Sequence, residues 1–164
     1  MLKKNILDAI NEQIKNEIES AYLYLSMAAH FSAANLNGFA HWMRVQWQEE
    51  LDHALKLFDH IGDRGGRVTL KAIAEPPREF GSPLAIFQKV AEHERQVTSL
   101  IDGLYELATK EKDHATQVEL QWFVREQVEE EKNVGQIVEL LKLAGDQVAA
   151  VLALDRGLAA RKVE

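Results

Sequence analysis

Four glutamates interrupt apolar stripes that otherwise repeat every three or four residues along the chain. Glu17, for example, lies between Ile14 and Ala21 on a stripe that suits the inner face of a helix. Taking several carboxylates out of water costs several kcal/mol for each ion unless another charge neutralises them. No Lys or Arg stands at the matching inner positions, so the pattern predicts a bound divalent or trivalent cation. The polar residues on the stripes are Glu17, Glu50, His53, Glu94, Gln127 and Glu130.

The sequence Glu50-x-x-His53 offers two candidate ligands to one ion. Residues three apart lie on the same face of a helix, so both side chains can reach one point. Carboxylate oxygen with a single imidazole and no sulfur suits iron or manganese better than a cysteine-type zinc site. Di-iron bundles combine one Glu from each of two helices with Glu-x-x-His from each of two others. The chain departs from this pattern only at the second pair, which is Gln127 with Glu130.

Each of these residues also has a simpler interpretation. A single Glu on an apparent inner face is more often a misjudged helix phase, or a side chain that reaches solvent. A lone His such as His53 is more often a core or surface residue than a ligand. Four helices interrupted at one level favour the metal site. The residues predicted at the surface or in subunit contacts are His30, His41, His60, His93, His114 and the solvated acid Glu131.

Long helices must position these side chains, because Pro and Gly are scarce and clustered. The prolines are residues 76, 77 and 83, and four of the nine glycines lie between residues 62 and 81. The rest of the chain is rich in Ala, Leu, Glu, Gln and Lys, which favour helix. Apolar spacing predicts helices over about 4–35, 38–62, 83–112 and 113–144, and a short one over 147–160.

Local signals mark several helix ends. Asn37 is a predicted cap of the second helix, and Ser82 before Pro83 is a typical start for the third. Gly145 fits the end of the fourth helix. The apolar stripe of the first helix is predicted to include Leu25.

These elements predict an all-α fold, a four-helix bundle over about 4–144 within one domain, 1–164. Helices of this length are roughly 42 Å long. The connection of about twenty residues between the second and third helices is uncommonly long for a loop. A crossover that runs the length of the bundle explains it.

Composition excludes several classes of protein. Lys and Arg total 19 against 26 Asp and Glu, so the net charge of −7 argues against a nucleic-acid partner. The chain has no Cys, which excludes disulfide scaffolds, iron–sulfur clusters and thiol nucleophiles. Charged residues break up any signal-peptide core or membrane span, and we expect a cytoplasmic protein with no membrane partner.

As a combination, the motifs resemble the non-haem ferritins of bacteria and archaea over nearly the whole chain. The residues that carry the resemblance are Asn11-Glu12-Gln13-Ile14, Glu17, Tyr24, Gln48-Glu49-Glu50-Leu51-Asp52-His53, His93-Glu94, Leu120-Gln121-Trp122-Phe123 and Glu126-Gln127-Val128-Glu129-Glu130-Glu131. Rubrerythrin-like proteins need a Cys-rich iron site, which this chain lacks. Bacterioferritins have a haem-ligating Met where this chain has Leu51, so no haem is expected. Ferritin light chains lack the oxidation ligands that are present here.

The resemblance implies a ferritin-like fold with a di-iron centre in each subunit. Glu17, Glu50 and His53 would hold the first iron, and Glu50 would bridge to a second iron held by Glu94 and Glu130. A third iron site would be formed by Glu49, Glu126, Glu129 and the shared Glu130.

Three further residues match positions beside the centre. Gln127 would hydrogen-bond near the second iron, and Tyr24 matches the tyrosine beside the di-iron site. Trp122 matches a nearby aromatic, for which core packing is favoured slightly over a role as electron donor.

The implied function is iron storage with ferroxidase activity. Fe(II) would be oxidised by dioxygen or hydrogen peroxide, and hydrous ferric oxide would collect inside a hollow homo-oligomeric shell of 24 subunits. Two alternatives stay open: a structural shell protein whose acids only nucleate mineral, and a di-iron oxygenase or peroxidase that acts on an organic substrate.

Overall fold

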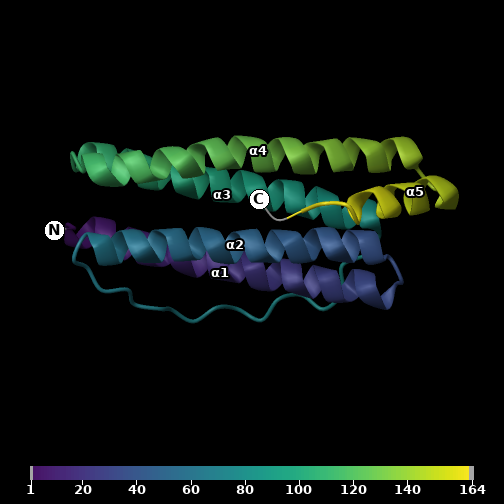
Figure 1. The fold of residues 1–164 in the computed structure, drawn as a ribbon, viewed down its shortest axis with the longest axis horizontal. Helices are drawn as coiled ribbons and strands as arrows, with labels where there is room; N and C mark the ends of the chain where they lie inside the picture. The colour runs from purple at the N-terminus through teal and green to yellow at the C-terminus, as the bar shows by residue number, and fades with distance from the viewer. Residues whose placement is uncertain (1, 163–164) are drawn as a thin grey trace.

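Two antiparallel helix pairs make up the body of the structure. The computed structural model describes residues 2–162, which contain α1 (Lys4–Ala33), α2 (Asn37–Asp63), α3 (Pro83–Lys110), α4 (His114–Ala144) and α5 (Val148–Leu158) and no strand. α1 packs along α2, and α3 packs along α4 (Figure 1). The predicted all-α bundle with a short fifth helix is confirmed.

The segment between α2 and α3 runs along the outside of the bundle from one end to the other (Figure 1). Its backbone is held to α1 by side chains of that helix. The Thr69 N–H donates to Asn11 Oδ1 over 2.8 Å, and the Ala74 N–H donates to Glu19 Oε1 over 2.9 Å. These bonds satisfy backbone N–H groups that lie outside any helix, and they hold the predicted crossover against α1.

The helix ends follow the predicted signals with one exception. The Ser82 side chain accepts from the Ala85 N–H over 3.2 Å, and Gly145, with φ of 52°, ends α4. The prediction that Asn37 caps α2 is wrong, because Asn37 is already helical and follows the N-cap Leu36. The chain reverses earlier, at Asn35, whose φ is 58°.

Two apolar clusters fill the bundle. One contains Phe31, Phe39 and Phe87, and lies toward the end of the bundle that carries α5. The other contains Ile10 and Leu120 and lies toward the N-terminus. The polar residues of the interrupted stripes lie between these clusters. Leu25, predicted on the inner stripe of the first helix, is instead 37% exposed, because it lies one residue past the buried Tyr24 and points outward.

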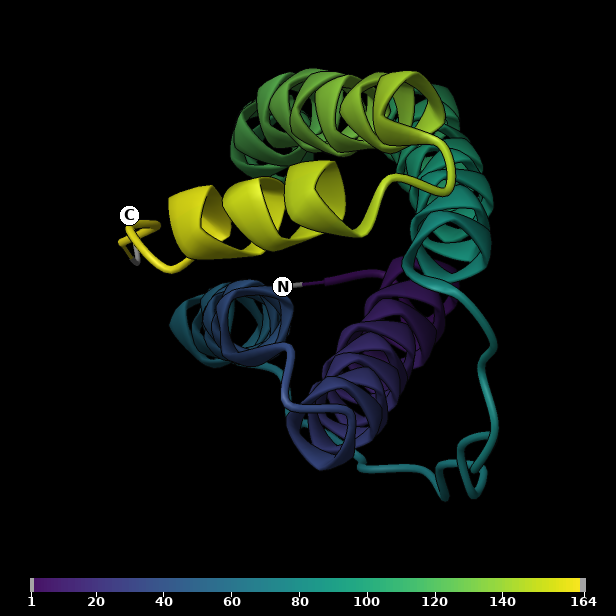
Figure 2. The ribbon, with the colours of Figure 1, turned by 90° about the vertical axis from the view of Figure 1, so that its right-hand side faces the viewer.

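The fifth helix closes one end of the bundle without entering its core. α5 lies between α2 and α4 (Figure 2) and contacts both. Val151, Leu154 and Leu158 pack half-buried against the cluster near Phe39, but none of the α5 residues is buried. Across residues 2–162, no helix is both long enough and apolar enough to cross a membrane.

Candidate metal centre

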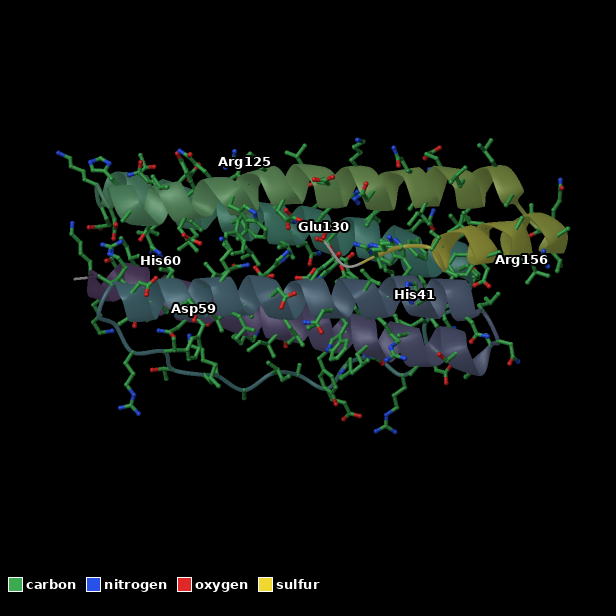
Figure 3. All side chains as sticks on the ribbon, in the orientation of Figure 1. His41, Asp59, His60, Arg125, Glu130 and Arg156 are labelled. Carbon is green, nitrogen blue, oxygen red and sulfur yellow. The ribbon has the colours of Figure 1, made fainter. Side chains whose placement is uncertain are left out.

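Four helices each bring a carboxylate to one level in the middle of the bundle. Glu17 of α1, Glu50 of α2, Glu94 of α3 and Glu130 of α4 are all buried, with at most 3% of each residue exposed. Figure 3 shows the labelled Glu130 between the two helix pairs. His53 lies one turn beyond Glu50 and is also buried. The interruptions predicted from the stripes therefore meet in space.

The first group of predicted ligands converges closely. Ligand atoms of Glu17, Glu50 and His53 all lie within 4.8 Å of one another. His53 Nδ1 is 3.5 Å from Glu50 Oε2. Two carboxylates and one imidazole at this spacing can hold a single hard divalent cation.

Three buried amides donate hydrogen bonds to the carboxylates. Gln13 Nε2 donates to Glu17 Oε1 over 2.8 Å. Gln46 Nε2 donates to Glu50 Oε1 over 3.2 Å and to Glu130 Oε1 over 2.8 Å. A fourth carboxylate has a similar donor: Gln127 Nε2 lies 3.3 Å from Glu94 Oε2. Gln127 therefore bonds to Glu94, which is a predicted ligand of the second iron.

The second oxygen of three carboxylates makes no hydrogen bond to a described residue. Among the residues that the structure describes, the buried Oε2 atoms of Glu17, Glu50 and Glu130 have no hydrogen-bond partner. Buried polar atoms are nearly always satisfied, and an orphaned carboxylate oxygen is costly. A cation bound between these oxygens removes that cost. The donor set therefore fits iron.

Burial makes these groups reluctant to carry charge in the absence of metal. Desolvation, followed by the charge of Glu50, raises the pKa of Glu17 well above its usual value. Desolvation and the charges of Glu94 and Glu130 do the same to the pKa of Glu50. The pKa of Glu130 is raised to about 8, chiefly by desolvation and then by Glu94. The metal-free centre thus retains protons at neutral pH that a bound cation would displace.

Tyr24 lies directly beside the carboxylates. Its buried hydroxyl donates a hydrogen bond to Glu94 Oε1. Desolvation and the charge of Glu94 raise the pKa of Tyr24 well above its usual value, so the phenol stays protonated. The edge of the His93 ring faces Tyr24 at 5.8 Å between centroids, and His93 Nε2 is 2.8 Å from Ser20 Oγ. His93, predicted at the surface, is thus half-buried behind the tyrosine.

Trp122 contacts His53, the predicted histidine ligand. Its ring meets His53 edge to face at 5.3 Å between centroids and meets Phe123 at 4.9 Å. The ammonium of Lys56 lies 4.9 Å from the centre of the Trp122 ring on the outer side. These contacts fix the orientation of the His53 ring, in keeping with the predicted packing role.

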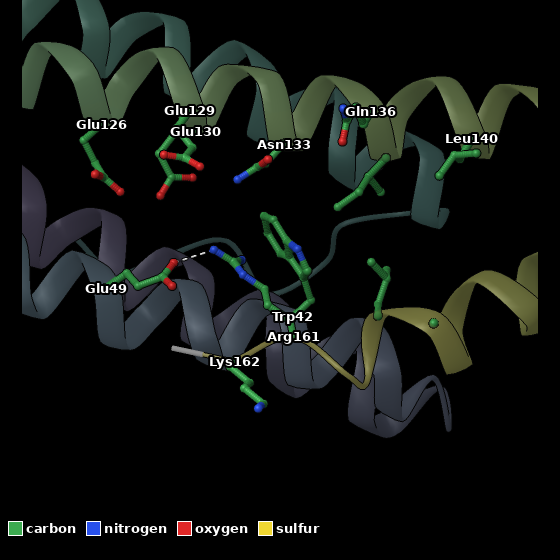
Figure 4. Close-up of a pocket in the computed structure, with 13 residues that line it drawn as sticks. Trp42, Glu49, Glu126, Glu129, Glu130, Asn133, Gln136, Leu140, Arg161 and Lys162 are labelled. Carbon is green, nitrogen blue, oxygen red and sulfur yellow. Dashed lines mark hydrogen bonds and ion pairs between the residues drawn. The ribbon is translucent and has the colours of Figure 1, made fainter. Parts of the chain in front are cut away.

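An acidic pocket of about 480 Å³ lies next to the buried centre (Figure 4). Glu126, Glu129 and Glu130 descend from α4 toward Glu49 on α2. Glu49 is buried, Glu126 is half-buried and Glu129 is exposed. The residues predicted for a third iron therefore share one pocket, and Glu130 belongs to both regions.

The pocket also contains a cation that the sequence patterns missed. Arg161, beyond the end of α5, forms an ion pair with Glu49 (Figure 4). The inference that no basic residue reaches the inner positions holds for the helix stripes. The pocket lies outside those stripes, and Arg161 reaches it because the segment after α5 folds back over α2.

Besides His93, two more residues predicted at the surface or in subunit contacts have partners within the chain. His60 is buried near the end of the bundle (Figure 3), and its Nε2 is 3.1 Å from Thr116 Oγ1. Glu131 is half-buried and accepts a hydrogen bond from Thr98 Oγ1 over 2.6 Å. Both predictions failed because side chains of neighbouring helices, Thr116 of α4 and Thr98 of α3, contact these positions.

Known proteins are similar to this chain in sequence and in architecture. The sequence profile of the ferritin-like domain matches residues 7–144. A bacterial non-heme ferritin of Bacteroides fragilis is 46% identical over 161 residues, which cover 98% of this chain and 100% of that protein. A bacterial non-heme ferritin of Staphylococcus haemolyticus is 38% identical over 164 residues, which cover 100% of this chain and 99% of that protein.

Solved structures agree with the fold over the full length. An engineered closed form of the Archaeoglobus fulgidus ferritin is 54% identical and covers 100% of both chains, with a TM-score of 0.98. The open pore ferritin of the same archaeon is also 54% identical, with a TM-score of 0.97 over 99% of this chain and 100% of the other.

Proposed function

The chain belongs to the ferritin family, and from that premise we propose that it is an iron-storage protein that oxidises Fe(II) to Fe(III). Fe(II) is the substrate, and two ions bind at the buried centre of each subunit. Glu17, Glu50 and His53 bind one ion, while Glu94 and Glu130 bind the other with Glu50 as the bridge. The observation that carries this proposal is the set of buried carboxylate oxygens on α1, α2 and α4 that have no hydrogen bond among the described residues.

The ligand set favours the oxidised ion. Hard carboxylate oxygens stabilise Fe(III) relative to Fe(II), which lowers the potential of the bound pair. Two Fe(II) ions supply two electrons, which with two protons reduce dioxygen to hydrogen peroxide. Protons held by Glu17, Glu50 and Glu130 in the metal-free state are released when Fe(II) binds.

The product is stored in an assembly of many copies of this chain. We propose a hollow homo-oligomeric shell of 24 subunits in the cytoplasm, in which hydrous ferric oxide collects. The excess of acidic over basic residues supports a role in iron storage, because a negative electrostatic field attracts Fe(II) to the particle. Glu49, Glu126 and Glu129, with Glu130 shared, form a third iron site in the adjacent pocket.

The test is Glu50→Ala in the assembled, metal-free protein. We expect fast Fe(II) oxidation, followed by absorbance after stopped-flow mixing with oxygenated buffer, to disappear because both irons lose a ligand. Glu139→Ala is the matched control, since Glu139 is exposed on α4, far along the helix from the centre. Size-exclusion chromatography should give the same particle for both variants.

Other outcomes would identify the alternatives. A structural shell that only nucleates mineral would oxidise iron at the same rate in both variants. An oxygenase or peroxidase for organic substrates would run as a monomer or dimer and retain only two or three irons per chain after repeated loading. Either result would overturn the proposal.

A further inference from the structure

The segment that follows α5 brings a guanidinium into the acidic pocket. Arg161 pairs with Glu49, and its Nη1 donates to Gln46 Oε1 over 2.8 Å. The guanidinium also stacks over the Trp42 ring, 4.3 Å from the ring centre. His41 Nε2 donates to the Arg161 carbonyl oxygen over 2.7 Å. Four contacts of different kinds therefore hold this residue in one place.

Arg161 is a largely buried cation that lies among carboxylates. Only 18% of its side chain and 10% of that of Glu49 are exposed. Glu126, Glu129 and Glu130 face Glu49 and Arg161 across the same pocket (Figure 4). A positive charge here stabilises the acids, because charges in a partly dry pocket interact more strongly than in water.

A metal ion would need the same oxygens. Glu49 can give both oxygens to the arginine, or turn them to a cation held with Glu126 and Glu129. The guanidinium and a divalent cation in the pocket also repel each other, so each lowers the affinity of the pocket for the other. The buried centre differs in this respect, since its carboxylates are bonded by neutral amides such as Gln46.

We propose that Arg161 is an internal competitor of the third metal ion, which it keeps weakly bound so that iron can pass through the pocket. The inference rests on the proposed function, because the third site has meaning only beside a working di-iron centre. Arg161 leaves Glu49 when metal enters and returns when metal leaves. The pocket is thereby a place of transit rather than of permanent binding.

The experiment is a calorimetric titration of the assembled, metal-free protein with Zn(II), which binds carboxylates and imidazole without redox chemistry. The wild-type protein should bind two ions tightly and a third more weakly. We expect Arg161→Gln to tighten the third site by about tenfold, equivalent to about 1.4 kcal/mol. The two tight sites should keep their number, which also shows that the variant is folded.

Lys162→Gln is the matched control, because Lys162 lines the same pocket, is exposed and carries the same charge. It should tighten the third site by less than about twofold, since exposed charges are screened. Arg161→Lys should lie between wild type and Arg161→Gln, because an ammonium lacks the planar fork that contacts Glu49 and Gln46 together.

Equal third-site affinity in Arg161→Gln and Lys162→Gln would overturn the inference. Weaker binding in Arg161→Gln would also overturn it, since Arg161 would then position Glu49 for metal rather than compete. If the wild-type protein did not bind two Zn(II) ions tightly, that result would instead contradict the proposed function.

Discussion

Glu49 and Glu50 are neighbours in the sequence, yet they belong to two different kinds of acidic region. Successive helical residues point about 100° apart. Glu50 therefore faces the middle of the bundle, where carboxylates meet neutral amides and have unpaired oxygens. Glu49 faces the adjacent pocket, where Arg161 neutralises it.

The two regions compensate for the negative charge of their carboxylates in different ways. In the buried centre, the charge is suppressed by bound protons, as the raised pKa values of Glu17, Glu50 and Glu130 indicate. In the pocket, solvent and a guanidinium stabilise the charge. A metal ion that enters the centre displaces protons, whereas a metal ion that enters the pocket competes with a guanidinium.

The largest expected effect is seen when a Glu→Gln substitution in the buried centre is compared with one in the pocket. Glu17→Gln should slow Fe(II) oxidation by at least about a hundredfold, because the first iron loses one of its charged ligands. Glu129→Gln, in the exposed part of the pocket, should change the initial rate by less than about threefold. Stopped-flow absorbance on matched, assembled proteins measures both. Similar losses in the two variants would mean that the regions act as a single site.

A smaller effect concerns stability without metal. The pKa of Glu130 rises from 4.5 to about 8, so its protonated form stabilises the fold. That contribution is fully present below the unfolded pKa and is lost as pH rises through about 8. Metal-free wild type should therefore melt at lower temperature as pH rises from about 5 to about 8.

Glu130→Gln should flatten this dependence and stabilise the metal-free protein at pH 8 by about 1–3 kcal/mol. Calorimetric melting across the pH range measures the effect, with Glu129→Gln as the exposed control on the same helix. Saturating Zn(II) should reverse the order, because the substituted protein has lost a ligand. An unchanged slope in Glu130→Gln would contradict a protonated carboxyl at this position.

Much of the buried centre could be predicted because helical periodicity alone determines which residues face inward. Glu17, Glu50, Glu94 and Glu130 each broke an apolar stripe, and the stripes fixed both the helices and their common level. The assignment of individual ligands to individual irons came from the family resemblance and stays a prediction, as does the extent of the single domain.

The supporting amides were within reach of the same reasoning. Gln13 and Gln46 stand four residues before Glu17 and Glu50, a spacing at which a helical side chain can donate to the next turn. His60, Glu131 and Arg161 were not accessible in this way. Their partners are Thr116, Thr98 and Glu49, which come from distant segments, so only the packed structure brings them together.

The smallest expected effect tests whether the two regions communicate. Gln46 is bonded to both, because its oxygen accepts from Arg161 while its nitrogen donates to Glu50 and Glu130. Arg161 can only donate, so it fixes which way the amide points. Gln46→Met keeps the length of the side chain but removes all three bonds. We expect oxidation about tenfold slower than wild type, the size typical of residues that orient metal ligands.

The control for Gln46→Met is Gln48→Met, because Gln48 lies on the same helix and donates to Asp52 at the surface, away from both regions. A tenfold loss confined to Gln46→Met, together with tighter Zn(II) binding in the pocket, would show that the amide joins a charged guanidinium to the protonated centre. Equal rates in the two variants would mean that Glu50 and Glu130 hold their positions unaided. The centre and the pocket would then be independent regions that happen to share Glu130.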